Sequence, residues 1–190
     1  MKKVKICLKK IVTPLCILTL LLGPGSSHLA AQPTVNPVSK LNAKLIFSVS
    51  PELTELNEHE IALQYPSALT RPTWVFIKRQ NNVRFLINYG ATKASDKNLP
   101  EIKTYYEKLY KAAAKNFISS KIIYVNKRPF VLMQFETASS PGGSEFVYNY
   151  LFMTTIDGEL IIFNYFFPST DRVTELEQAG KILYSLKAGH

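Results

Sequence analysis

The sequence predicts a single α+β domain in which a central antiparallel sheet of about six strands lies between layers of helix, an α/β/α sandwich. Two observations carry this prediction. First, the runs on either side of Asp157-Gly158 are apolar at almost every position, so both faces of these strands need cover. Second, a segment after Pro100 and another before Gly189 have apolar residues at steps of three and four, the spacing of one helix face. One amphipathic helix on each face of the sheet satisfies both observations.

The first 31 residues predict a secretory signal peptide. Met1 to Lys10 holds five lysines and no acid, and the apolar run from Ile11 to Gly23 precedes a segment of small residues, which is the pattern of an export signal. The run is short of the roughly 20 residues that span a bilayer. We therefore expect export, to the periplasm or as a secreted protein, with cleavage near Ala31. An uncleaved anchor is the alternative, because neither Leu29 nor His28 is the small residue expected three positions before the cut.

Removal of this segment changes the composition. Both cysteines, Cys7 and Cys16, are lost, so the mature domain is cysteine-free and has no disulfide, thiol nucleophile or thiolate metal site. Five of the 23 basic residues and none of the 14 acidic ones lie in residues 1–31, which leaves a net charge of +4. This charge favours acidic partners or anionic headgroups. A nucleic-acid partner is not expected, because the chain is exported and has no concentrated basic stripe.

The remaining ~159 residues have the length of one domain. We expect residues 32–40 to be a flexible lead-in and residues 41–188 to form the domain. Residues 43–51 and 60–66 are typical of two short strands around a polar stretch from Glu52 to Glu60. Residues 73–79 and 83–91, rich in aromatic and β-branched side chains, predict a hairpin that turns at Gln80 to Asn82, since asparagine tolerates turn geometry.

The second half predicts helix, four strands and a final helix. Pro100 suits the first position of a helix, whose apolar face holds Ile102, Tyr106, Leu109, Ala113 and Phe117. Strands are expected at 121–125 and 129–138, and at 145–156 and 159–167, after a loose loop at 139–144. Asp157-Gly158 between two apolar runs is a strong hairpin signal. Ser169 to Asp171 offer a cap for a last helix that ends near Lys187.

The order of these elements resembles the PsbP-like superfamily. The resemblance spans Leu41 to Lys187 and is carried by "EIALQYPSALTRPTWVF", "LPEIKTYYEKLYKAAAKNF", "VNKRPFVLMQFETAS", "VYNYLFMTTIDGELIIFNYFFP" and "AGKILYSLK". The chain most resembles bacterial, exported DcrB-like proteins of unknown function. The resemblance implies a non-enzymatic protein. Relatives act as assembly factors of photosystem II or as nucleotide-release factors for the Ran GTPase, but no residue motif here transfers either role.

Seven residues are candidates for a partner-binding surface: Arg71, Trp74, Lys78, Arg79, Arg84, Lys127 and Arg128. An arginine next to the single tryptophan suits an anionic or aromatic group. The other five flank two predicted turns, and they form one basic patch if both turns lie at the same end of the sheet. The alternative is that these residues have no binding role: Trp74 packs in the core, and the charged side chains are solvated at the tips of turns.

No constellation of residues predicts a reaction. Glu55 and His59 would share a helix face at i,i+4 as a metal pair, but a solvated loop is the simpler interpretation, and neither G-x-S-x-G nor a phosphate-binding loop occurs. We therefore expect no catalytic residue, no cofactor and no metal. The expected function is an exported, non-catalytic binding or assembly module of the cell envelope, whose partner is an envelope protein or an anionic membrane surface. The alternative is a carrier of a small apolar ligand held between sheet and helix.

Overall fold

A computed structural model describes residues 35–140 and 143–188, and the expected signal peptide lies outside this range. The elements are β1 (Asn36–Lys40), β2 (Leu45–Val49), β3 (Thr54–Glu55), α1 (Glu58–Gln64), β4 (Trp74–Lys78), β5 (Val83–Lys93), α2 (Leu99–Ala113), β6 (Asn116–Val125), β7 (Arg128–Ala138), β8 (Phe146–Ile156), β9 (Glu159–Pro168), α3 (Arg172–Ser185) and β10 (Lys187–Ala188). Among the helices of the described residues, none has the length and hydrophobicity that crossing a bilayer requires.

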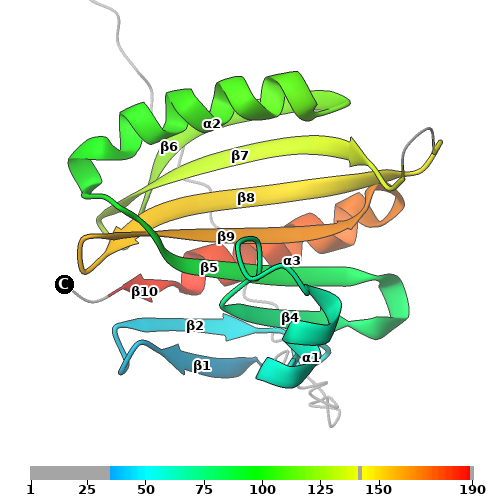
Figure 1. Ribbon diagram of the computed structural model, residues 1–190, viewed down its shortest axis with the longest axis horizontal. Helices are drawn as coiled ribbons and strands as arrows, with labels where there is room; N and C mark the ends of the chain where they lie inside the picture. The colour runs from blue at the N-terminus through cyan, green and yellow to red at the C-terminus, as the bar shows by residue number, and fades with distance from the viewer. Residues whose placement is uncertain (1–34, 141–142, 189–190) are drawn as a thin grey trace, which may run out of the picture. The chain divides into compact units, whose positions relative to one another are not determined.

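The central sheet is antiparallel and has seven strands in the order β3-β4-β5-β9-β8-β7-β6. It is larger than the six strands that the sequence predicts. A second, three-stranded sheet has the order β1-β2-β10. The long strands β7, β8 and β9 cross the middle of the view in Figure 1, with α2 along one side of the sheet and the small sheet along the other.

Both faces of the central sheet are covered, as the sequence predicts. On one face, Ile61 of α1 packs with Val75 and Ile77 of β4, and Leu99 of α2 packs with Met133 of β7. On the opposite face lie α3 and β2, and the buried residues of this layer include Phe47, Phe85, Phe163, Ile182 and Leu183. Alternation along the strands explains the division, since successive side chains of a strand point to opposite faces.

Aromatic rings fill the α3 side of the core. Phe85 stacks on Phe163 with ring centroids 6.2 Å apart, and Phe163 stacks on Phe152 at 4.8 Å. Phe47 of the small sheet meets Phe85 edge-on at 5.7 Å. All four side chains are fully buried. The apolar runs around Asp157-Gly158 are therefore the middle of a core.

The strand predicted at residues 60–66 is wrong, because this segment begins with helix α1. Asn57 caps the helix: its side chain accepts a hydrogen bond from the Glu60 amide at 3.0 Å, and Glu60 Oε2 accepts one from the Asn57 amide at 3.0 Å. This reciprocal capping box satisfies two backbone donors of the first turn. Glu55 and His59, considered above as a metal pair on one helix face and set aside, do not share a helix, because Glu55 lies in β3 and His59 in α1.

Two further boundaries differ from the prediction. Asn36–Lys40, expected to be a flexible lead-in, form β1 and pair with β2. The predicted helix that reaches Phe117 ends at Ala113, and β6 begins at Asn116. The Lys115 amide donates to the Glu136 carbonyl at 2.8 Å, so pairing with β7 replaces the helix at this point.

Candidate functional site

The two basic turns lie at opposite ends of the central sheet, so the five basic residues of these turns do not form one patch. Arg84, just after the β4–β5 turn, pairs with Phe166 near the end of β9. Arg128 opens β7, in which Val131 pairs with Met153 near the end of β8. The end of β8 adjoins the start of β9. The condition for a single patch is therefore not met, and each end of the sheet has to be considered by itself.

Arg71 and Trp74 serve local structure. Arg71 Nε donates to the Tyr65 carbonyl at 2.9 Å and its Nη2 to the Pro66 carbonyl at 3.0 Å, which ties the loop after α1 to itself. Trp74 is half-buried against the core, and Lys40 Nζ lies 5.6 Å from the centre of its ring.

Lys78 is held by two carboxylates at the side of the sheet that faces α3. Its Nζ lies 2.6 Å from Glu52 Oε2 and 3.2 Å from Glu175 Oε1, and the Tyr165 hydroxyl donates to Glu175 Oε2 at 2.5 Å. The hydrogen bond to Glu52 raises the pKa of Lys78, and burial raises the pKa of Tyr165. The lysine therefore stays an ammonium and the tyrosine a phenol, and neither acts as a base near neutral pH.

The β6–β7 turn carries Lys127 and Arg128. Lys127 is exposed at the tip, with a left-handed φ of 67°. Arg128 donates to the Thr155 carbonyl and lines a hollow of about 510 Å³ together with Asp96 and Asp157. Acids and bases balance one another at this end of the sheet.

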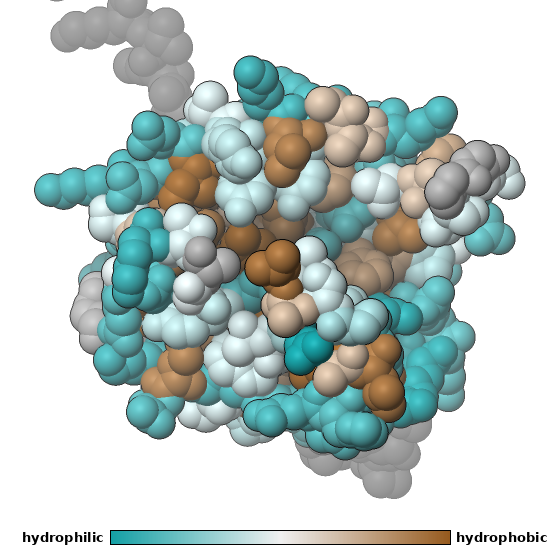
Figure 2. Space-filling view, viewed as in Figure 1, coloured by the Kyte–Doolittle hydropathy of each residue, from teal (hydrophilic) through white to brown (hydrophobic). Residues whose placement is uncertain are grey.

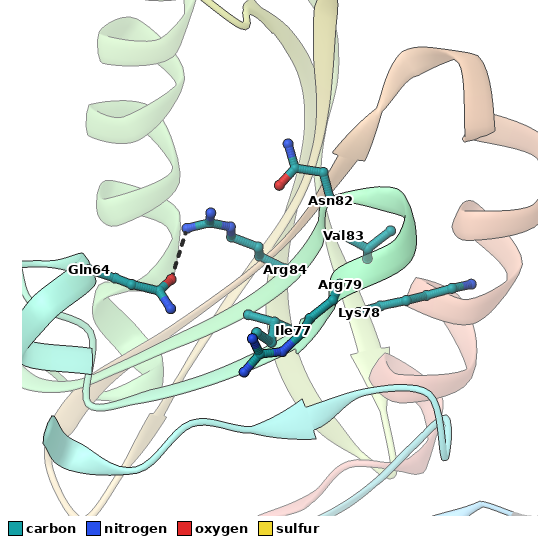
Figure 3. Close-up of a pocket in the computed structure, with 7 residues that line it drawn as sticks. All are labelled: Gln64, Ile77, Lys78, Arg79, Asn82, Val83 and Arg84. Carbon is teal, nitrogen blue, oxygen red and sulfur yellow. Dashed lines mark hydrogen bonds between the residues drawn. The ribbon is translucent and has the colours of Figure 1, made fainter. Parts of the chain in front are cut away.

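The β4–β5 turn borders a surface hollow of about 450 Å³, lined by Gln64, Ile77, Lys78, Arg79, Asn82, Val83 and Arg84. Arg79 and Arg84 extend toward the side of α1, whereas Lys78 extends the other way, toward α3 (Figure 3). Arg84 Nη1 donates to the Tyr65 hydroxyl at 3.1 Å and to Gln64 Oε1 at 3.4 Å. Arg79 Nη2 lies 3.7 Å from Glu60 Oε1.

Positive charge at this hollow is only partly compensated. The half-buried Arg84 bonds to neutral acceptors, and no carboxylate of the described residues lies within ion-pair distance of it. Glu60, the acid near Arg79, also serves the capping box of α1. Two guanidinium groups at one hollow suit an anion, since each presents planar donors that match carboxylate or phosphate. The hollow therefore presents two guanidinium groups, of which only Arg79 has a carboxylate nearby among the described residues.

Similar solved structures share the architecture. The sequence matches no protein-family model and no curated protein. The fold is similar to cyanobacterial PsbP (CyanoP) from Synechocystis sp. PCC 6803, at 12% identity and a TM-score of 0.54 over 87% of this chain and 98% of that one. LpqN of Mycobacterium tuberculosis has 10% identity and a TM-score of 0.57, over 83% and 91% of the two chains. The chain has the PsbP-like fold.

A third structure with the PsbP-like fold is the Ran-binding protein Mog1p of Saccharomyces cerevisiae, at 7% identity and a TM-score of 0.51 over 83% of this chain and 96% of that one. Identities this low establish the fold alone. The predicted closeness to DcrB-like proteins stays a prediction.

Exposed apolar side chains occur on the same face of this PsbP-like domain as the hollow. Leu63 of α1 and Leu69 of the following loop are 69% and 98% exposed, and Tyr105 and Leu109 of α2 are 65% and 47% exposed. Hydrophobic residues appear as separate spots across the view, among hydrophilic residues (Figure 2). Leu63 lies next to Gln64 of the hollow, whereas Tyr105 and Leu109 belong to α2, which packs on β6 and β7.

The sequence identified both arginines of the hollow but not their neighbours. Gln64 and Tyr65 belong to the segment predicted as a strand, and α1 brings them to Arg84 across 20 and 19 positions of chain. The capping box Asn57–Glu60 was the signal that would have revealed this helix.

Proposed function

We propose that this protein is an exported, non-catalytic binding or assembly module of the cell envelope, and that its hollow at the β4–β5 turn holds an anionic group of an envelope partner. Arg84 carries the proposal. Its guanidinium is half-buried beside the hollow and bonds only to neutral acceptors among the described residues, and Arg79 stands next to it. A partner's carboxylate or phosphate would supply the missing charge through paired hydrogen bonds.

The structural neighbours support a binding role by analogy of fold. LpqN is described as involved in cell envelope biogenesis, and Mog1p as a Ran-binding protein. The same fold therefore serves binding proteins in different settings, and the expected export of this chain favours the envelope.

The carrier alternative is supported only by a surface hollow of about 460 Å³ at the start of α2, whose lining includes Ile102, Tyr106 and Leu160. The space under α2 is filled by Leu99, Val131, Met133, Phe135 and Leu151, which are all buried. The space under α3 is filled by the aromatic core. A ligand between sheet and helix would have to displace these side chains.

Photo-crosslinking in the native envelope tests the proposal. A photoreactive residue is placed at Gln80, which is exposed in the β4–β5 turn, and a matched one at Lys127, which is exposed at the opposite end of the sheet. We expect Gln80 to yield one defined neighbour that Lys127 does not yield. Arg84→Gln, which keeps a hydrogen-bond donor but removes the charge, should reduce that crosslink by about tenfold, the loss expected for one charged hydrogen bond.

Two outcomes decide against the proposal. One is a scatter of crosslinks with no difference between the two positions. The other is a Gln80 crosslink that Arg84→Gln leaves unchanged. A lipid found in place of a protein at Gln80 identifies the anionic membrane surface as the partner. The unfolding midpoint of Arg84→Gln, measured in parallel, separates loss of binding from loss of fold.

A further inference from the structure

Strand β6 is an open sheet edge of ten residues. The other outer strands are short: β3 and β10 have two residues each, and β1 has five. Within β1, Pro37 also lacks a backbone N–H to offer. Short strands and proline are devices that protect edges from further pairing. β6 is neither short nor interrupted by proline, and its protection is limited to one bulge and one lysine. No described strand pairs with its outer side.

The backbone of this edge decides what kind of molecule binds there. Alternate residues of β6 bond to β7, and the N–H and C=O groups between them face outward. A bulge falls between Phe117 and Ser119, and the pairing from Ser119 to Val125 is regular. A row of outward donors and acceptors at this spacing matches another extended chain, the mode of recognition known as strand addition.

The charge around β6 is positive. Lys121 is the single charged residue of the strand and is exposed. From α2, Lys111 Nζ lies 5.3 Å from the centre of the Phe117 ring. Lys103 and Lys111 share one carboxylate, Glu107, each at 2.6 Å, and together they lower the pKa of Glu107 to about 2.

The three lysines outnumber the two acids next to β6, Glu107 and Glu136, of which Glu136 accepts a hydrogen bond from the Asn116 side chain at 3.2 Å. The edge therefore repels a second copy of itself and attracts negative charge. We propose that β6 accepts an extended, acidic segment of a partner protein as an additional strand of the central sheet. The Arg79–Arg84 hollow lies near β4 and β5, at the far side of the strand order from β6, so this proposal stands independently of the proposed function.

Hydrogen exchange with synthetic peptides tests the proposal on the full chain. The probe is a capped ten-residue peptide of alternating glutamate and valine. One control replaces every glutamate by lysine, and another replaces four consecutive central residues of the glutamate peptide by proline. In the free protein, the outward amides of β6 exchange quickly because they have no strand partner. We expect the glutamate peptide to slow their exchange about tenfold, and both controls to have little effect.

Two charge variants test whether the protection depends on the positive charge of β6. Lys121→Glu should abolish the protection, whereas Lys97→Glu, an equal change of charge at an exposed loop residue, should keep it. Equal protection by the lysine or proline peptide would overturn the proposal, as would protection by the glutamate peptide outside β6 or at no amide at all. A dimer in solution that protects β6 without peptide, and that Lys121→Glu strengthens, would assign the edge to a second copy and also overturn it.

Discussion

The ion pair between Lys78 and Glu175 lies between the sheet and α3, with side-chain exposures of 15% and 2%. The Glu175 carboxylate also accepts a hydrogen bond from Tyr165. Together with Tyr165, the pair joins three elements, because the three residues come from β4, α3 and β9. Removal of Lys78 leaves the Glu175 carboxylate buried with no cation beside it and only the Tyr165 hydroxyl as a donor, which is the costly case for a buried ion pair.

We therefore predict that Lys78→Met lowers the free energy of unfolding by about 3 kcal/mol, measured by urea denaturation. Combining it with Glu175→Leu should recover part of this loss, because the uncompensated carboxylate is then gone. Lys181→Met is the matched control. It breaks the exposed pair with Glu177 at i,i+4, which is worth about 0.5 kcal/mol or less. Equal losses in the two lysine variants would show that the Lys78–Glu175 pair is not effectively buried.

At the scale of elements, two hairpins of the central sheet turn through the same geometry with different residues. Asp157 and Gly158 have φ values of 53° and 75°, and Asn126 and Lys127 have 49° and 67°. Both turns have two left-handed residues between directly paired strand ends, the arrangement in which asparagine or aspartate followed by glycine is preferred. Lys127 occupies the second position of its turn, although its Cβ makes the left-handed conformation less favourable than it is for glycine.

The two turns therefore predict opposite effects. Lys127→Gly should raise the free energy of unfolding by about 1 kcal/mol, because glycine adopts the left-handed region at little cost. Gly158→Ala should lower it by a similar amount, although a Cβ at this position meets no atom within 4 Å, so the loss reports backbone strain alone. Thermal unfolding of both variants measures the difference. If Lys127→Gly is less stable than the unsubstituted protein, the left-handed assignment of that turn is wrong.

The elements that the sequence predicted correctly are those with a local cause. The Asp157-Gly158 hairpin and the presence of α2 and α3 are of this kind, although Tyr110 and not Leu109 packs against the core from α2. The segment Ile61, Leu63, Tyr65 alternates like a strand, and Ile61 is the one buried residue of α1, so hydrophobic pattern could not identify this helix. The small sheet joins β1 and β10 to β2, across most of the chain. The hollow likewise depends on a contact between α1 and β5, which no local pattern encodes.

At the scale of the whole molecule, each face of the sheet buries a tyrosine. Tyr110 of α2 stacks on Phe135 of β7 with ring centroids 4.3 Å apart. Tyr150 of β8 lies on the α3 side and is 7% exposed. Burial raises the pKa of each phenol to about 12. Ionisation of either phenol therefore opposes the packing around it.

This burial predicts a loss of stability at alkaline pH. A group whose pKa is raised by folding contributes fully below its unfolded pKa, about 10 for tyrosine, and this contribution is lost as pH rises toward the folded pKa of about 12. We expect the free energy of unfolding to fall between these values. Measured against its own value at pH 8, the free energy of unfolding of Tyr110→Phe should fall less than that of the unsubstituted protein. The difference should reach about 1–3 kcal/mol at pH 12. Tyr150 lies on the opposite face of the sheet, so the effects of Tyr110→Phe and Tyr150→Phe on the alkaline loss of stability should add in the double variant. Urea denaturation from pH 8 to pH 12 measures both, and a Tyr110→Phe curve parallel to that of the unsubstituted protein would mean that α2 leaves its phenol in water.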